Sequence, residues 1–378
     1  MHQTLLAELG LPPFRPRAPW WGPDLQTLRD TLRGNGPNDP TRARPLKLPV
    51  GEGACLLALL DLPDHEPARG LVLLSHGLGG SSESEGTRRL SMALRQEGFA
   101  VLRLNLRGAG AGRSLAPGTY AADCNRDLLP VLRQARRLAA ELGQPGRPLP
   151  LAGTGLSLGG TILLNAQAAA WRQGDAGLDA LACISSPLDL QACTRRFEQT
   201  RNLLYQRWLV RRLRQQVLDD HLGLQEHERR AMLGGDRPRS IRAFDALITA
   251  PRWGHASVEA YYSAASPMRW LTSGLPLPPT LVLHATDDPW VPAGAAIALT
   301  QPLGRACPAE APPALSAPEA AAAGTGLRPA GAPPESLEVV LTSGGGHNGF
   351  HAPGDSPTGS WSDRLTARWL RNRLSPGG

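Results

Sequence analysis

Cysteine is scarce in this chain of 378 residues, which holds five cysteines in all. Their number is odd, they are scattered, and no two of them have the C-x-x-C spacing of a zinc or redox site. We therefore expect neither a disulfide framework nor a bound metal, and we place the protein in a reducing, cytoplasmic compartment. The five are Cys55, Cys124, Cys183, Cys193 and Cys307.

Long apolar runs are also missing. No stretch approaches the ~18 consecutive apolar residues of a membrane helix. The first fourteen residues carry Glu8 and lack a basic segment. The sequence therefore predicts neither a membrane-spanning helix nor a secretory signal peptide.

Lysine occurs once, at Lys47, so arginine supplies nearly all of the positive charge behind a net charge of +7. The arginines are spread over several segments, with one dense run at 195–214. Aromatic residues make up 5% of the chain, which is too little for a base-stacking surface. We expect no nucleic-acid partner.

What is present is an ordinary globular composition, with 41% hydrophobic and 19% charged residues. Short apolar runs alternate with helical patterns along the chain, which predicts an α/β fold with a mostly parallel sheet and helices on both faces. The expected strands are 71–75, 99–104, 148–153, 178–185, 280–285 and 337–342, and the expected helices are 86–97, 123–142, 157–171 and 361–374.

Three segments depart from this alternation. Residues 1–43 are rich in proline and glycine and are interpreted as an N-terminal arm lying on the body, residues 44–378. Residues 187–270 hold amphipathic helical patterns and no convincing strand, so we predict a helical cap inserted between two core strands. Residues 303–336 are dominated by Ala, Pro and Gly, which favours a flexible low-complexity insertion.

A G-L-S-L-G motif at 155–159 lies between an expected strand and an expected helix. With 42 glycines in the chain the motif alone has little specificity. The strand–turn–helix context is that of a nucleophile elbow, in which a tight turn presents a serine at a helix N-terminus. We predict that Ser157 is a nucleophile.

A serine hydroxyl needs a base to react, and in this fold an acid and then a histidine follow later in the chain. The strand at 280–285 leads into Asp287 and Asp288, and the strand at 337–342 leads into His347 in a glycine-rich loop. His347 would accept the serine proton, and an aspartate would orient the imidazole. We favour Asp288, which lies four residues before Pro292, and keep Asp287 as the alternative.

Acyl transfer also requires hydrogen-bond donors for a tetrahedral oxyanion. One expected donor is the backbone amide of Leu158, directly after the nucleophile. The other is the amide of Leu78, in the glycine-rich loop S-H-G-L-G-G at 75–80. His76 in this loop is interpreted as a structural hydrogen-bonding residue rather than a base.

Taken together, the motifs resemble the YheT-like branch of the α/β-hydrolase superfamily, hydrolases of the esterase, lipase and thioesterase type. The resemblance implies an α/β-hydrolase fold and places Ser157, the Asp287/Asp288 pair and His347 at the family's triad positions. The insertion at 303–336 is not typical of the family. The matching segments are 19–27, 76–82, 105–108, 155–160, 241–245, 249–251, 261–266, 285–289 and 345–350.

We therefore expect a serine hydrolase that cleaves small-molecule carboxylic esters, with a short- to medium-chain or lipid-like acyl group, through an acyl-enzyme and without metal or organic cofactor. One alternative is an alcohol O-acyltransferase with the same triad, and another is a non-catalytic binding protein of the same fold. A third is a membrane-surface lipid hydrolase that uses the cap arginines, although membrane contact is not our main expectation. The oligomeric state stays open. The cap arginines are Arg207, Arg211, Arg212 and Arg214.

Overall fold

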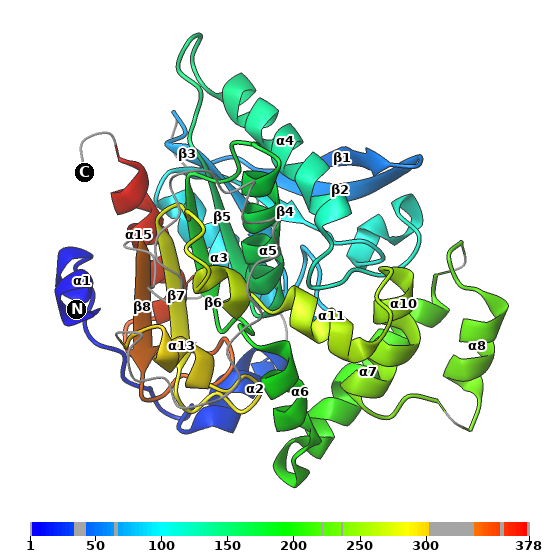
Figure 1. Cartoon of the computed structure of the whole chain (residues 1–378). Coiled ribbons are helices and arrows are strands. Elements are labelled where there is room, and N and C mark those ends of the chain that lie inside the picture. Colours follow the sequence, from blue (N-terminus) through cyan, green and yellow to red (C-terminus); the bar gives the residue numbers. More distant parts are fainter. Residues whose placement is uncertain are drawn as a thin grey trace.

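The computed structural model describes residues 2–33, 43–63, 67–220, 222–235, 237–301, 336–355 and 359–375. Its strands form one sheet of eight, in the order β1-β2-β4-β3-β5-β6-β7-β8, with helices on both faces (Figure 1). Strands β4, β3, β5, β6, β7 and β8 run parallel to one another, and β2 is antiparallel to both of its neighbours. The α/β class and the mostly parallel sheet are confirmed. The strands are β1 (Arg44–Gly51), β2 (Ala54–Asp61), β3 (Gly70–Ser75), β4 (Phe99–Leu104), β5 (Leu151–Leu156), β6 (Ala180–Ile184), β7 (Thr280–Ala285) and β8 (Leu337–Thr342).

Two strand predictions need correction. The strand expected at 148–153 is observed as β5, three residues later, because Pro148 and Pro150 lack the amide hydrogen that a ladder needs. The strands expected from the sequence did not include β1 and β2, which form a hairpin. β1 is an edge strand with two prolines and mostly exposed residues, so it lacks the apolar run by which buried strands are recognised.

Side chains alternate between two cores along each central strand. Leu71 and Leu73 of β3 face one core, which includes α4 (Asn125–Leu142) and α5 (Leu158–Arg172). Val72 and Leu74 face the other, which includes α3 (Glu85–Gln96) and α15 (Trp361–Leu374). Because successive side chains of a strand point to opposite faces, both faces of the sheet carry apolar side chains. Helices cover both faces, and the packed sheet supports the loops at its edge.

The first residues pack against the core that contains α15. In α1 (His2–Glu8) and just after it, leucines at 5, 6, 9 and 11 are buried in that core. The indole N–H of Trp361 donates to the carbonyl of Pro12, and Figure 1 shows α1 on the side of the sheet where β8 and α15 lie. A second helix, α2 (Pro23–Arg33), follows and approaches the site described below.

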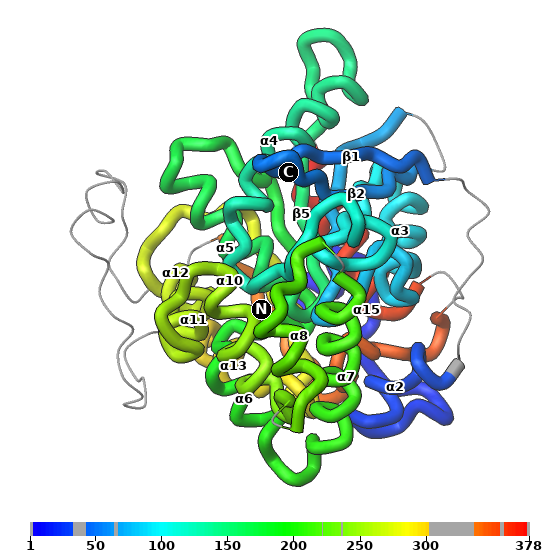
Figure 2. The backbone as a smooth tube through the Cα atoms, turned by 90° about the vertical axis from the view of Figure 1, so that its right-hand side faces the viewer, coloured from blue at the N-terminus to red at the C-terminus, as the bar shows by residue number. Residues whose placement is uncertain are grey.

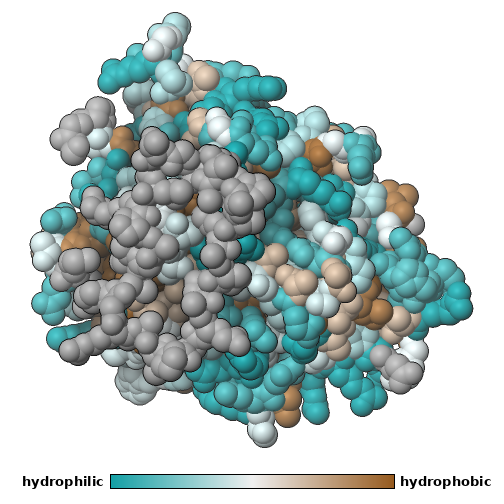
Figure 3. Space-filling model, viewed as in Figure 1, coloured by the Kyte–Doolittle hydropathy of each residue, from teal (hydrophilic) through white to brown (hydrophobic). Residues whose placement is uncertain are grey.

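Between β6 and β7 the chain forms helices that gather on one side of the sheet, which Figures 1 and 2 show from two directions. The face in Figure 3 is mostly hydrophilic over these helices, with small hydrophobic areas between the polar ones. The division into arm, core and cap stays a prediction. The expected insertion lies, apart from Ser336, outside the described residues. The helices are α6 (Leu190–Glu198), α7 (Leu203–Leu218), α8 (Glu226–Leu233), α9 (Ile241–Phe244), a π-helical turn (Asp245–Thr249), α10 (Ala250–Arg252), α11 (Val258–Ala265) and α12 (Met268–Leu271), with α13 (Gly294–Ala298) after β7.

Within the described ranges, no helix combines the length and the apolar character that crossing a bilayer would require.

A buried arginine joins three helices that lie far apart in the sequence. Arg89 of α3 is 3% exposed. Its guanidinium lies 2.5 Å from a carboxylate oxygen of Asp30 in α2 and 2.6 Å from one of Asp363 in α15. Asp363 also caps the start of α15 by accepting from the backbone amide of Ser360. This cluster therefore fixes α2 against the body of the fold.

We predict that Arg89→Met lowers the free energy of unfolding by about 3–5 kcal/mol, because it leaves two carboxylates without their buried cation. The matched control is Arg113→Met, which removes an ion pair with Asp219 that is about one-third exposed and should cost less than about 1 kcal/mol. Urea denaturation followed by circular dichroism measures both. Equal, small losses for the two variants would contradict a fixing role for Arg89.

Candidate active site

Ser157 occupies the turn between β5 and α5. Its backbone has φ 53° and ψ −126°, a strained conformation for a residue with a side chain. A Cβ on Gly155 would collide with the backbone of Gly160, and one on Gly159 would collide with the carbonyl of Ser75. The glycines of the motif are therefore required by close backbone approach, and the turn presents the Ser157 hydroxyl beyond the end of β5.

The structure brings Ser157 together with the predicted histidine. His347 follows β8, and its Nε2 lies 2.9 Å from Ser157 Oγ. On the other side of the ring, Nδ1 lies 2.9 Å from Asp288 Oδ2. His347 and Asp288 are 5% and 3% exposed. Three side chains that follow β5, β7 and β8 thus form one hydrogen-bonded chain at the carboxyl edge of the sheet.

The two neighbouring aspartates make different contacts. Asp288 Oδ1 accepts from the backbone amides of Trp290 and Val291, so its second oxygen is aimed at His347. Burial by itself would raise the pKa of Asp288, but the facing imidazoles of His347 and His284 and the Val291 amide lower it below its usual value. Asp287 instead accepts from the backbone amide of Gly346, and burial raises its pKa.

Trp290 is a neighbour of the histidine that sequence reasoning did not single out. Its ring stacks on the His347 imidazole, with centroids 4.6 Å apart and planes 30° apart. Aromatic stacking of this kind limits the rotation of the imidazole without using either ring nitrogen. The only available signal was its place in the D-D-P-W-V-P segment that supplies the aspartates.

The N-terminal segment also positions the histidine loop, which explains why residues 19–27 carry a recognisable motif. Thr27 Oγ1 accepts from the backbone amide of His347 at 2.8 Å. The Gln26 amide bonds to both the carbonyl and the amide of His351. Gly346 and Gly349 lie so close to α2 that a Cβ on either would collide with it. The loop is therefore clamped between α2 and the sheet.

The loop after β3 lies across the turn from Ser157. The His76 ring bonds to the Gly77 carbonyl at 2.8 Å and to the Leu106 amide at 3.2 Å. Burial lowers the pKa of His76 to about 4, so the ring is neutral, and His76 makes the structural contacts expected of it. The Gly79 amide donates to the Tyr120 hydroxyl, which fixes the loop. The backbone amides of Leu78 and Leu158 donate to no acceptor in the described part of the chain.

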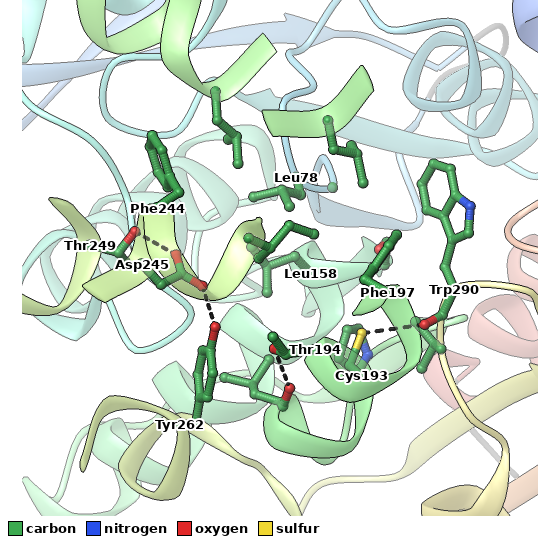
Figure 4. Close-up of a pocket in the computed structure, with 18 of the residues that line it drawn as sticks. Leu78, Leu158, Cys193, Thr194, Phe197, Phe244, Asp245, Thr249, Tyr262 and Trp290 are labelled. Carbon is green, nitrogen blue, oxygen red and sulfur yellow. Dashed lines mark hydrogen bonds between the residues drawn. The ribbon is translucent and has the colours of Figure 1, made fainter. Parts of the chain in front are cut away.

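A cavity opens beside Ser157 and His347, with about 1030 Å³ of open space including its mouth. Leu78, Leu158 and Trp290 line it, and side chains from α6, α7 and α9 complete it (Figure 4). Its apolar side chains include Leu190, Phe197, Leu209, Leu213, Ile241, Phe244 and Val291. A second, more polar groove of about 810 Å³ shares His347, Leu78 and Trp290 with it. One apolar space and one more polar space thus meet at His347.

One polar group in the apolar cavity was not predicted as a site residue. Asp245 begins the π-helical turn and lines the cavity. Its carboxylate accepts from the hydroxyls of Thr249 and Tyr262, at 2.7 Å and 2.8 Å (Figure 4). Burial raises the pKa of Asp245 to about 6. The sequence did mark this segment, because residues 241–245 are one of the segments that resemble the family. Nothing in the sequence indicated that the Asp245 carboxyl lines a cavity.

The cap arginines do not form one uniform face. Arg207, Arg211 and Arg212 are exposed on α7, whereas Arg214 is turned towards the Met232 carbonyl of α8. Arg212 donates to the Gly79 carbonyl at 3.2 Å, so this surface adjoins the loop that holds Leu78. Among the described residues no group of three or more His, Cys, Asp or Glu side chains is arranged to hold a metal ion.

Comparison with known proteins shows which family this chain resembles. The family model "Hydrolase_4: Serine aminopeptidase, S33" matches residues 66–309. The putative esterase YheT of Escherichia coli is 30% identical over 65% of this chain and 69% of its own length. The phospholipase ABHD3 of Mus musculus is 31% identical over 60% of this chain, which spans only 52% of ABHD3.

Among solved structures, a bacterial brefeldin A esterase shares the fold with a TM-score of 0.53, at 17% identity over 98% of this chain and 86% of that one. The motifs, the sheet and these matches agree with the resemblance stated from the sequence. The chain belongs to the YheT-like branch of the α/β-hydrolase family, and it is a hydrolase of the esterase and lipase type.

Proposed function

We propose that this chain hydrolyses carboxylic esters through an acyl-enzyme, with Ser157 as nucleophile, His347 as general base and acid, and Asp288 as the residue that orients the imidazole. The observation that carries the proposal is the pair of 2.9 Å contacts from the His347 ring, one to Ser157 Oγ and one to Asp288 Oδ2. Asp287 is engaged by the Gly346 amide, which favours Asp288 for this role.

Each step follows from these positions. Ser157 Oγ attacks the ester carbonyl while His347 Nε2 takes its proton. The amides of Leu78 and Leu158, which have no acceptor in the described ranges, bind the resulting oxyanion. Collapse of this intermediate breaks the bond to the alcohol, which leaves with the proton from His347. Water then gives a proton to His347 and attacks the acyl-serine. As the bond from the acyl group to Ser157 Oγ breaks and the acid is released, His347 returns this proton to Oγ.

The cavity supports an apolar acyl group of short to medium length, or a lipid-like one, because leucine, phenylalanine and isoleucine side chains dominate its wall. The alcohol O-acyltransferase alternative uses the same acyl-enzyme, with an alcohol in place of water. The scattered cysteines, of which Cys55, Cys124, Cys183 and Cys193 are free thiols, fit the proposed cytoplasmic location.

A second candidate function, a hydrolase acting at a lipid surface, is favoured by α7. Leu204 and Trp208 of this helix are 76% and 41% exposed, and Arg207 and Arg211 are exposed beside them. Exposed apolar side chains among arginines suit an anionic lipid interface. The mouse relative is named a phospholipase, and Trp208 lines the groove that leads to His347.

The first prediction concerns the nucleophile. We expect Ser157→Ala to lower kcat for p-nitrophenyl esters by a factor on the order of 10⁶, the scale measured when the nucleophile of a serine protease is removed. Labelling by a fluorophosphonate probe should disappear with it. The control is Ser114→Ala, an exposed serine outside the site, which should keep both. Residual labelling of Ser157→Ala would contradict the assignment, and ester synthesis on addition of ethanol would favour the acyltransferase.

The neighbouring aspartates provide a matched pair of variants. Asp288→Asn should lower kcat by about 10⁴, because an amide can donate to Nδ1 and hold the imidazole in the wrong tautomer. Asp287→Asn keeps an oxygen for the Gly346 amide, so its kcat should stay within about tenfold of native. Steady-state kinetics on one ester decides, and the reverse order of effects would assign the role to Asp287.

The lipid-surface candidate predicts binding to vesicles that contain phosphatidylserine, with an affinity that falls as salt rises. Arg207→Gln with Arg211→Gln should weaken this binding about tenfold or more, at about 1 kcal/mol per arginine. Arg133→Gln with Arg137→Gln is the matched control, since these are exposed arginines of α4 with the same spacing. Vesicle sedimentation measures both, and equal losses for the two pairs would reject a specific role for α7.

A further inference from the structure

The carboxyl group of Asp245 is partly buried in the cavity wall, and no cation among the described residues pairs with it. Its two hydrogen-bond partners, the hydroxyls of Thr249 and Tyr262, are neutral. No ion pair joins Asp245 to any residue in the part of the chain that the structure describes. Removing an ionised carboxylate from water with only neutral partners is costly. A hydrocarbon chain in the cavity would make no hydrogen bond that offsets this cost.

Asp245 lies at the end of the cavity away from the catalytic histidine. Trp290, which stacks on His347, is on one side of Figure 4, and Asp245, Thr249 and Phe244 are on the opposite side with Leu78 and Leu158 between them. An acyl group bound to Ser157 and extending along the cavity would therefore pass apolar side chains first and reach Asp245 with its far end.

A second polar residue, Thr119, lines the same cavity. Thr119 is 7% exposed and lines the cavity, and its hydroxyl has no hydrogen-bond partner among the described residues. The Thr119 carbonyl accepts from the indole of Trp253, which follows Thr249 by one helical turn. Thr119 therefore belongs to a part of the wall that is joined through Trp253 to the helical turn of Thr249.

The backbone and its aromatic neighbours agree with a built site. The π-helical turn that begins at Asp245 interrupts the helical run from α9 to α10, and such turns are frequent at functional sites. Phe244, Tyr261 and Tyr262 line the cavity with it. A carboxylate among aromatic rings, in apolar surroundings, is complementary to a protonated amine or a hydroxyl group.

We propose that Asp245, with Thr249 and Tyr262, forms a polar subsite that binds a hydrogen-bond donor at the far end of the substrate's acyl group. The substrates are then esters of acids that carry a hydroxyl or an ammonium group beyond an apolar middle. This inference rests on the proposed ester hydrolysis and on the acyl group occupying the cavity.

The test compares three sets of p-nitrophenyl esters of equal chain length, from about four to ten carbons, whose acyl groups end in a methyl, a hydroxyl or an ammonium group. At the best length, the native protein should show a kcat/KM at least about tenfold higher for a donor-ended ester than for the methyl-ended one, the scale of a charge-assisted hydrogen bond in apolar surroundings. The ammonium and hydroxyl sets separate the two donors.

Two variants test whether Asp245 causes the preference for donor-ended esters. Asp245→Asn should remove the ammonium preference, reduce a hydroxyl preference less because the amide oxygen still accepts, and leave the methyl-ended rate within about threefold. Leu209→Met, an apolar change in the same wall, is the control and should leave the ratio between the sets unchanged. The native ratio decides the matter even if Asp245→Asn folds poorly.

The outcomes separate the two proposals. Hydrolysis of methyl-ended esters with no donor preference at any length overturns the subsite and leaves the proposed function intact. A melting temperature that falls in Asp245→Asn, with an unchanged ratio, assigns Asp245 to a structural tie between the π-helical turn and α11 and also overturns it. Absence of ester hydrolysis and of fluorophosphonate labelling in the native protein removes both proposals.

Discussion

The site depends on one chain of hydrogen bonds, from Ser157 through the His347 ring to Asp288. Its three side chains come from the ends of β5, β8 and β7, so their meeting depends on the parallel sheet that puts these ends on one edge. The strained Ser157 backbone persists because the packed strand and helix on either side of it determine its path. Sheet order and packing are thus the conditions for the chemistry, and the helices over the cavity shape what enters it.

The histidine loop is held by more than the sheet. Thr27 accepts from the His347 amide, and Gln26 bonds to the backbone of His351. α2, which carries both, is tied to the body through the contact of Asp30 with Arg89. A change at Arg89, which is distant from Ser157 in the sequence, is therefore coupled to the placement of His347 through one short helix.

Much of this was predictable because it is local. The parallel strands at 71–75, 280–285 and 337–342 have short apolar runs, and the turn at 155–159 needs glycines that the sequence displays. Strand β1 was not predicted, because its prolines and exposed residues give it no apolar run. Contacts across long separations were not predictable in detail: nothing in the sequence says that Thr27 meets His347, or that Trp290 stacks on its ring.

Asp288 and Asp245 show how surroundings decide the use of one residue type. Asp288 faces imidazoles and accepts two backbone amides, so its carboxylate is stabilised and its pKa is lowered despite burial. Asp245 has two neutral hydroxyls, and burial prevails, so its pKa rises to about 6. The first has its counterpart inside the protein and can hold the His347 imidazole in place. The second has only neutral partners among the described residues, which is why we propose that a donor on the substrate complements it.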